Sequence, residues 1–186
     1  MEPHKFEELL RLYAQFKDES KDEDFGFDDE WLLFLKKMCL LSPKSYGTKI
    51  QNRVIIRNNF NKVSQKDDKG DFEINNEYYE LKTSVITVTN KTANISGLRK
   101  YQNINGYYIL LIDASDYNRP QTYIYKLSKK EMNNEMKTMK ACPLNGTKQA
   151  NINNKNIPYR IGLLIKDDSK DFKRWNELYT CNDLIL

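Results

Sequence analysis

The chain has 186 residues and a formal net charge of +4 at pH 7, and 39% of its residues are hydrophobic, so we expect one folded domain with a sizeable core. Its one histidine, His4, argues against Ser-His-Asp or Cys-His catalysis and against a histidine-rich zinc site. Cys39, Cys142 and Cys181 fit neither a disulfide framework nor a Cys-x-x-Cys metal site, which indicates reduced thiols in a cytoplasmic protein. No apolar run approaches the roughly 18 residues that cross a bilayer, and no signal peptide opens the chain, so we expect no membrane association.

The charge is distributed unevenly along the chain. Residues 1–30 hold eleven acidic and four basic residues, a net charge of −7, so the remainder of the chain carries +11. A basic body with an acidic end is typical of a protein that binds a polyanion. The alternative is ordinary solvated surface charge in a lysine-rich protein.

The N-terminal part of the chain has helical patterns. Apolar residues recur at helical spacing over 6–16, and a second helix is predicted over 30–41, capped by Asp28 or Asp29 and stopped by Ser42-Pro43. A third helix is predicted over 45–60. It has one stripe of apolar residues and one of basic residues at a spacing of four: Tyr46, Ile50 and Val54; Lys49, Arg53 and Arg57.

The pattern then changes to the alternation of β-strands. The predicted strands are 71–74, 77–88, 106–113, 121–127 and 157–165. The predicted helices are a short one over 94–103, one over 128–141 opened by a Ser128/Glu131 capping box, and one over 169–179. We therefore expect a single α/β (α+β) domain with a central mixed β-sheet flanked by helices. Residues 1–43 would form an N-terminal helical, dimerising region and residues 44–186 the core.

One predicted hairpin brings charged side chains together. With Asn75-Asn76 as its turn, cross-strand partners have numbers that sum to 151, which places Asp71 opposite Glu80. Opposed residues have Cβ atoms roughly 4.5–5.5 Å apart, and like charges there are destabilising. Lys82 lies on the same face of the strand as Glu80, because strand side chains alternate. Asp71, Glu80 and Lys82 are therefore expected to converge.

This convergence has a chemical interpretation. Two close carboxylates repel unless a proton or cation intervenes, and Mg²⁺ commonly binds one or two carboxylates together with a substrate phosphate. Lys82 would orient or deprotonate an attacking water, or stabilise charge in the transition state. The chemistry expected is phosphodiester hydrolysis without histidine. The alternative is an exposed hairpin with ordinary charged residues, since Glu-x-Lys is a common string.

At these residues the chain resembles the PD-(D/E)xK nuclease superfamily, although no proline precedes Asp71. The string over 79–83 resembles the Tyr-Glu-Leu-Lys-Ser string of PvuII-type type II restriction endonucleases, and the likeness extends in pieces over 47–165. It implies a restriction-endonuclease-like core with N-terminal helices, Mg²⁺ as cofactor with Mn²⁺ as a substitute, double-stranded DNA as partner and a homodimer. Gln51 occupies a matching position before the site and is a candidate to line it, with a helix-surface amide as the alternative. Histidines that the family uses to read DNA are absent from 90–94, which implies a different recognition sequence.

Further residues are candidates for DNA contact. No acidic residue occurs from Leu81 to Ile112, as expected of a surface beside phosphates. The candidates, each with a solvated side chain as the alternative, are Lys49, Arg53, Arg57, Thr83, Ser84, Asn90, Lys91, Thr92, Asn94, Arg99 and Lys100. For Tyr78, Tyr79, Tyr107 and Tyr108 we expect packing rather than base stacking.

Together these patterns predict a type II restriction endonuclease that makes sequence-specific, Mg²⁺-dependent double-strand cuts. Asp71, Glu80 and Lys82 are the expected catalytic residues, and Asp71 and Glu80 the metal ligands. Two enzymatic alternatives remain open, a structure-specific repair or junction nuclease and one subunit of a heteromeric restriction enzyme. A non-enzymatic alternative is a DNA-binding module with a decayed site.

Overall fold

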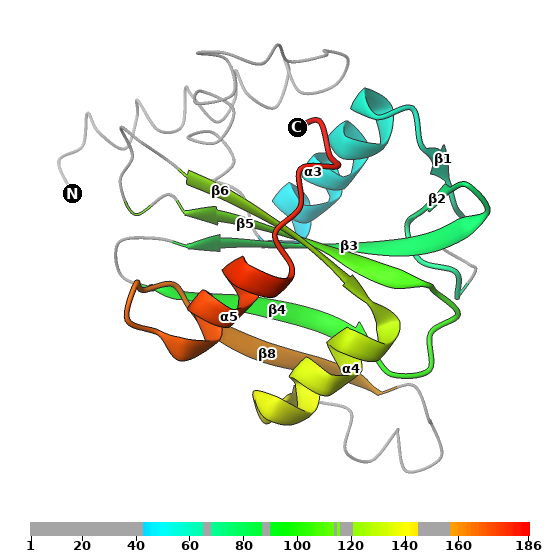
Figure 1. Ribbon diagram of the computed structural model, residues 1–186. Coiled ribbons are helices and arrows are strands. Elements are labelled where there is room, and N and C mark those ends of the chain that lie inside the picture. Colours follow the sequence, from blue (N-terminus) through cyan, green and yellow to red (C-terminus); the bar gives the residue numbers. More distant parts are fainter. Residues whose placement is uncertain (1–42, 65–67, 87–89, 114, 116–120, 145–156) are drawn as a thin grey trace, which may run out of the picture.

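The computed structural model describes residues 43–64, 68–86, 90–113, 115, 121–144 and 157–186. The helices predicted over 6–16 and 30–41, and with them the proposed dimerising region, lie outside these residues. The described part has the α+β architecture that the sequence predicts: a mixed β-sheet, a smaller second sheet and helices on both sides (Figure 1).

The main sheet of the described residues has five strands in the order β1-β2-β3-β5-β6. Its strands are β1 (Asn61–Lys62), β2 (Phe72–Ile74), β3 (Glu77–Ile86), β5 (Gly106–Asp113) and β6 (Gln121–Ser128). β3 and β5 are parallel, and the other neighbours are antiparallel. β5 lies between β3 and β6 and is buried from Gly106 to Ile112, because structure covers both of its faces.

The second sheet contains β4 (Thr92–Arg99), β8 (Pro158–Leu164) and β7 (Cys142–Pro143), with β8 in the middle. The short helix predicted over 94–103 is therefore wrong. Ala93, Ile95 and Leu98 are buried and face the core, while the backbone of this segment pairs with β8. The register shifts between Ser96 and Leu98, where Gly97 has a φ of +78°. This β-bulge disguises the strand, since it spaces Ile95 and Leu98 three residues apart.

Among the described residues, three helices cover the main sheet: α3 (Pro43–Arg57), α4 (Lys129–Thr138) and α5 (Lys170–Leu178). The predicted capping box is confirmed, because the Ser128 hydroxyl accepts from the Glu131 N–H and the Glu131 carboxylate accepts from the Ser128 N–H. α3 lies on one side of the main sheet, and α4, α5 and the second sheet lie on the other (Figure 1). None of the described helices is both long and apolar enough to span a membrane.

Two apolar clusters follow from this layering. The α3 side contains Ile50, Val54 and the aromatic group Phe72, Tyr79 and Tyr108. The opposite side contains residues of β4 and β8 together with residues of α4 and α5, among them the fully buried Trp175. Since each cluster removes large apolar side chains from water, the sheet is held from both faces. The side chains of Glu80 and Lys82 lie on the second of these faces.

Candidate active site

The hairpin between β2 and β3 has the register that the sequence predicts. Ile74 pairs with Glu77 and Phe72 with Tyr79, so partner numbers sum to 151. Asn75 and Asn76 have φ angles of 52° and 66°, as a two-residue type I′ turn requires. Asparagine tolerates positive φ better than most residues, which explains why the turn forms at this pair.

Asp71 is held at the end of this hairpin by backbone contacts. Its N–H donates to the Tyr79 carbonyl oxygen over 2.8 Å, and its Oδ2 accepts from the Leu81 N–H over 2.8 Å. Gly70, immediately before it, has a φ of +85°, and a Cβ atom there would lie 2.6 Å from the Tyr79 carbonyl oxygen. Glycine is therefore required at position 70 for Asp71 to approach β3 this closely.

Glu80 and Lys82 point to the same side of β3 and contact each other. Lys82 Nζ donates to Glu80 Oε1, and the Gln102 Nε2 donates to Glu80 Oε2 over 2.7 Å. Glu80 is only 8% exposed and Lys82 is half-buried. The candidate site thus lies where β3 is covered by the segment that joins β4 to β5. Gln102 is a residue that the sequence analysis missed.

The electrostatics of the site are those of two neighbouring carboxylates. Burial raises the pKa of Asp71 to about 6, and the negative charge of Glu80 acts in the same direction. Lys82, the Leu81 N–H and a hydrogen bond from Gln51 oppose the rise in this pKa. Gln51 of α3 therefore contacts Asp71. A local environment that disfavours the second negative charge favours a bound cation.

The donor set fits a hard divalent cation. Asp71 and Glu80 offer carboxylate oxygens, which are the ligands that Mg²⁺ prefers, and Mg²⁺ usually retains several waters instead of filling a cage of protein groups. No group of three or more His, Cys, Asp or Glu side chains suited to a metal occurs in the part of the chain that the structure describes. The two carboxylates suit Mg²⁺ or Mn²⁺, which take oxygen ligands.

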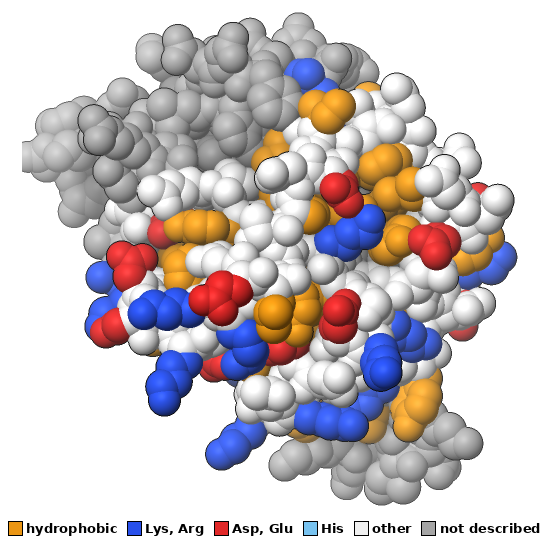
Figure 2. Space-filling model, in the orientation of Figure 1, with side chains coloured by type: hydrophobic (Ala, Val, Ile, Leu, Met, Phe, Trp, Pro, Cys, Tyr) orange, Lys and Arg blue, Asp and Glu red, His pale blue; other side chains and the backbone are white. Residues whose placement is uncertain are grey.

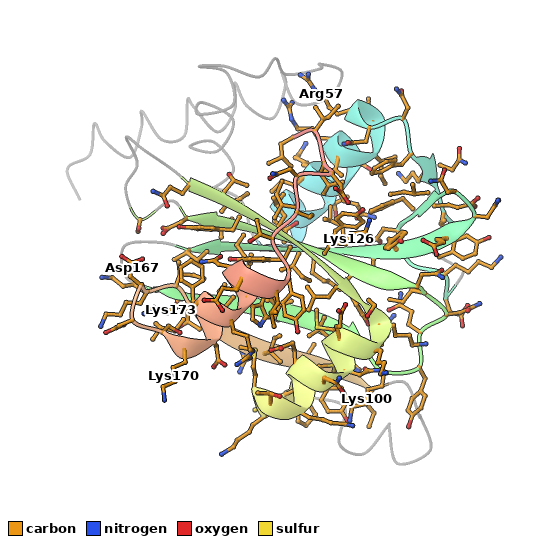
Figure 3. The ribbon with its side chains drawn as sticks, in the orientation of Figure 1. Arg57, Lys100, Lys126, Asp167, Lys170 and Lys173 are labelled. Carbon is orange, nitrogen blue, oxygen red and sulfur yellow. The ribbon has the colours of Figure 1, made fainter. Side chains whose placement is uncertain are left out.

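The candidate DNA contacts fall into two groups. Asn90, Lys91, Asn94 and Arg99 are exposed, on or beside β4, and Thr92 and Lys100 are half-buried there. The remaining candidates are less open: Thr83, Lys49 and Arg57 are half-buried, and Arg53 is 9% exposed. Arg57 lies at the end of α3, next to the C-terminal segment (Figure 3).

Ser84 does not fit its predicted role as a DNA contact. It is 4% exposed, and its hydroxyl accepts from the Asn94 N–H over 3.0 Å. This bond ties β4 to β3, so the side chain serves packing between the two sheets. The four tyrosines agree with expectation. Tyr79, Tyr107 and Tyr108 are buried, and the half-buried Tyr78 packs against the core with Lys69 Nζ 4.8 Å from its ring centroid.

The second sheet has an unusual charge composition. β4 comes from the acid-free stretch 81–112, and β7 and β8 come from another acid-free stretch, 136–166. The second stretch adds Arg160, which is exposed on β8 opposite Ser96. By contrast, the surface over α4 and α5 has basic and acidic side chains interspersed, with Lys170 and Lys173 near Asp167 (Figures 2 and 3). The second sheet is therefore the better match for a polyanion.

A scan of the sequence against models of protein families and a search of curated proteins both found no match. The candidate site consequently rests on its own geometry and on the motif in the sequence.

Proposed function

We propose that this protein is a Mg²⁺-dependent DNA endonuclease of the type II restriction kind. The observation that carries the proposal is that the charges of Glu80 and Lys82 act on the Asp71 carboxylate, which is bonded to the N–H of Leu81 between them. Two acids close together in a half-buried site are costly unless a proton or a cation intervenes, and a divalent cation would add to the compensation that Lys82 gives.

In this proposal Asp71 and Glu80 hold the cation. When bound, Mg²⁺ would neutralise charge on the phosphate and lower the pKa of a water ligand. Lys82 Nζ, oriented by Glu80 Oε1, would hold the attacking water or donate a hydrogen bond to the phosphoryl oxygen. The Leu81 N–H and Gln51 would keep the Asp71 carboxylate in place while the substrate changes.

The acid-free second sheet would supply the surface that faces DNA. Asn94 and Arg160 are exposed on adjacent strands of this sheet. β4 also approaches the candidate site, because a Cβ atom added at Gly97 would lie 3.4 Å from Lys82 Nζ. Asparagine and arginine side chains also read base edges in the major groove, which would provide sequence specificity.

The proposal is tested by incubating the protein with supercoiled plasmid and MgCl₂, with an EDTA control. Discrete, metal-dependent fragments are expected, and their ends would give the recognition sequence. Asp71→Ala, Glu80→Ala and Lys82→Ala should each abolish the fragments, with Glu73→Ala, on the same hairpin, as the control that keeps them. Wild-type cutting by any of the first three variants would refute the assigned roles.

The same assay separates the alternatives. Cleavage of junctions or flaps without a fixed duplex sequence would indicate a repair or junction nuclease, and cutting only with a second polypeptide would indicate a heteromeric enzyme. DNA binding without cutting under any metal would indicate a decayed site. A palindromic target would imply a two-fold homodimer, which sedimentation with and without DNA tests directly. A restriction enzyme would work in the cytoplasm, where its DNA is.

A further inference from the structure

The segment that joins β4 to β5 carries a buried amide directly over Glu80. Gln102 is 4% exposed, and its Nε2 donates to Glu80 Oε2 over 2.7 Å. Its other end, Oε1, is also buried and has no hydrogen-bond partner among the described residues. A glutamine with a purely structural role would satisfy both ends. This amide is instead oriented by the carboxylate, because the reverse orientation would set oxygen against oxygen.

The backbone of Gln102 is fixed from two directions. Lys129 Nζ donates to the Gln102 carbonyl oxygen over 2.5 Å, and the Lys129 N–H donates to the Asn105 carbonyl oxygen over 2.9 Å. Asn105 in turn exchanges two hydrogen bonds with the backbone of Tyr78 on β3, each over 2.8 Å. The first residue of α4 and the start of β3 therefore determine where the amide sits. Its position does not depend on a flexible loop.

Glu80 consequently has each oxygen held by a different residue. Lys82 occupies Oε1 and Gln102 occupies Oε2, so the plane of the carboxylate is set by groups from two separate segments. Of these, Lys82 is half-buried and has a proposed role in the reaction, whereas Gln102 is buried. A ligand that is oriented before its cation arrives loses less conformational freedom on binding.

We propose that Gln102 is a positioning residue that orients Glu80 for a divalent cation, an inference that rests on the proposed function of the site. Groups that hydrogen-bond a metal ligand commonly change metal affinity by about 10- to 100-fold when they are replaced. We expect a loss of this size for Gln102→Met, which preserves the length of the side chain and removes the amide. The affinity for DNA without metal should be unchanged, because the side chain is buried.

The experiment measures Mn²⁺ binding in the absence of DNA, from the electron paramagnetic resonance signal of free Mn²⁺. Wild type, Gln102→Met and the control Asn103→Ala, an exposed neighbour, are compared after circular dichroism has shown them folded. We expect Mn²⁺ affinity about 10- to 100-fold weaker for Gln102→Met and unchanged for Asn103→Ala. In the cleavage assay, raising the Mg²⁺ concentration should restore cutting by Gln102→Met but not by Lys82→Ala. A merely structural defect would not be rescued by metal.

The outcomes separate this inference from the nuclease proposal. Equal Mn²⁺ affinity of wild type and Gln102→Met would overturn the role of Gln102, whatever the cleavage result. Mn²⁺ binding by wild type without any cutting would refute the nuclease proposal and still test Gln102. Should Gln102→Met fail to fold, Lys129→Met replaces it, since it releases only the Gln102 carbonyl. A several-fold weaker Mn²⁺ affinity is expected there, and an unchanged affinity would overturn the inference.

Discussion

The carboxylate of Asp71 accepts a hydrogen bond from the backbone N–H of Leu81, the residue between Glu80 and Lys82, over 2.8 Å. Asp71 is therefore attached to the strand that carries the other two charged side chains as well as to its own. A small movement of either strand would carry the acid with it. The hairpin thus determines how Asp71 is placed relative to β3, and the surrounding structure buries these side chains.

Burial at this place makes stability depend on pH. The pKa of Asp71 is raised from 3.8 to about 6, so the folded state binds a proton that the unfolded state has released. Without metal, stability should fall as the pH rises from 3.8 to about 6 and remain at the lower level above that range. Asp71→Asn should remove this dependence. We expect a higher melting temperature than wild type at pH 8 in EDTA, and little difference near pH 4. A variant less stable than wild type at pH 8 would contradict the assignment.

Gly97 tests how closely β4 covers the site. Its φ of +78° disfavours any other residue, and an added Cβ atom would lie 3.4 Å from Lys82 Nζ. Gly97→Ala should lower the free energy of unfolding by about 1–3 kcal/mol and slow cleavage by crowding Lys82. The matched control is Gly47→Ala in α3, where nothing lies within 4 Å of the new Cβ atom. It should stabilise the protein by about 0.5–1 kcal/mol, as urea titrations would measure. Equal effects of the two changes would argue against the strain at Gly97.

The interface between α4 and α5 depends on one buried acid. Glu135 is 4% exposed and accepts hydrogen bonds from Arg174, Trp175 and Tyr179. Burial alone would raise the pKa of Glu135, but these hydrogen bonds outweigh burial and lower it. Glu135→Gln should cost about 2–4 kcal/mol of unfolding free energy at neutral pH.

Because that pKa is lowered, the stabilisation by Glu135 is complete above its ordinary pKa of 4.5 and is lost as the pH falls below it. The difference between wild type and Glu135→Gln in denaturant should therefore shrink in acid. A difference that grew as the pH fell would mean that the carboxylate is destabilising. Cleavage by the folded variant should be close to wild type, because this cluster is separate from Asp71, Glu80 and Lys82.

The second sheet is tested by the salt dependence of DNA binding. If Arg160 contacts a phosphate, Arg160→Gln should reduce the slope of log affinity against log salt by about 1. Lys173→Gln, on the mixed-charge surface of α5, should leave the slope unchanged (Figure 3). Binding can be measured by fluorescence anisotropy in EDTA between low and moderate salt. A smaller slope for Lys173→Gln together with an unchanged slope for Arg160→Gln would indicate that DNA binds the surface of α5 instead of the second sheet.

Features that depend on neighbouring residues could be predicted from the sequence. The turn at Asn75-Asn76 fixes its own register, and the capping box at Ser128 uses a residue three positions away. Both depend on local backbone chemistry, so no distant contact was needed to predict them. The pairing of Asp71 with β3 then followed from the register.

The features that were predicted wrongly or not at all depend on contacts between residues far apart in the chain. Ile95 and Leu98 are spaced as on a helix, and only the bulge at Gly97, formed against β8, makes them face the same way on a strand. Gln102 reaches Glu80 because Lys129, in a later part of the chain, holds the Gln102 backbone in place. Ser84 is hidden by β4, which no local pattern could predict. These features are properties of the assembled sheets.

The crossover from β3 to β5 also bears on the order of folding. Parallel strands need a connection that leaves the sheet, and here that connection is β4, whose partner strand comes much later: Ile95 pairs with Ile161, 66 residues further along. The hairpin with Asp71, Glu80 and Lys82 can close by local contacts, on the microsecond scale of hairpins. Its covering strand β4 has a partner to pair with only once β8, at Pro158–Leu164, has been synthesised. The charged cluster is thus assembled early and enclosed late, and the slow, long-range step in folding should be the docking of β8.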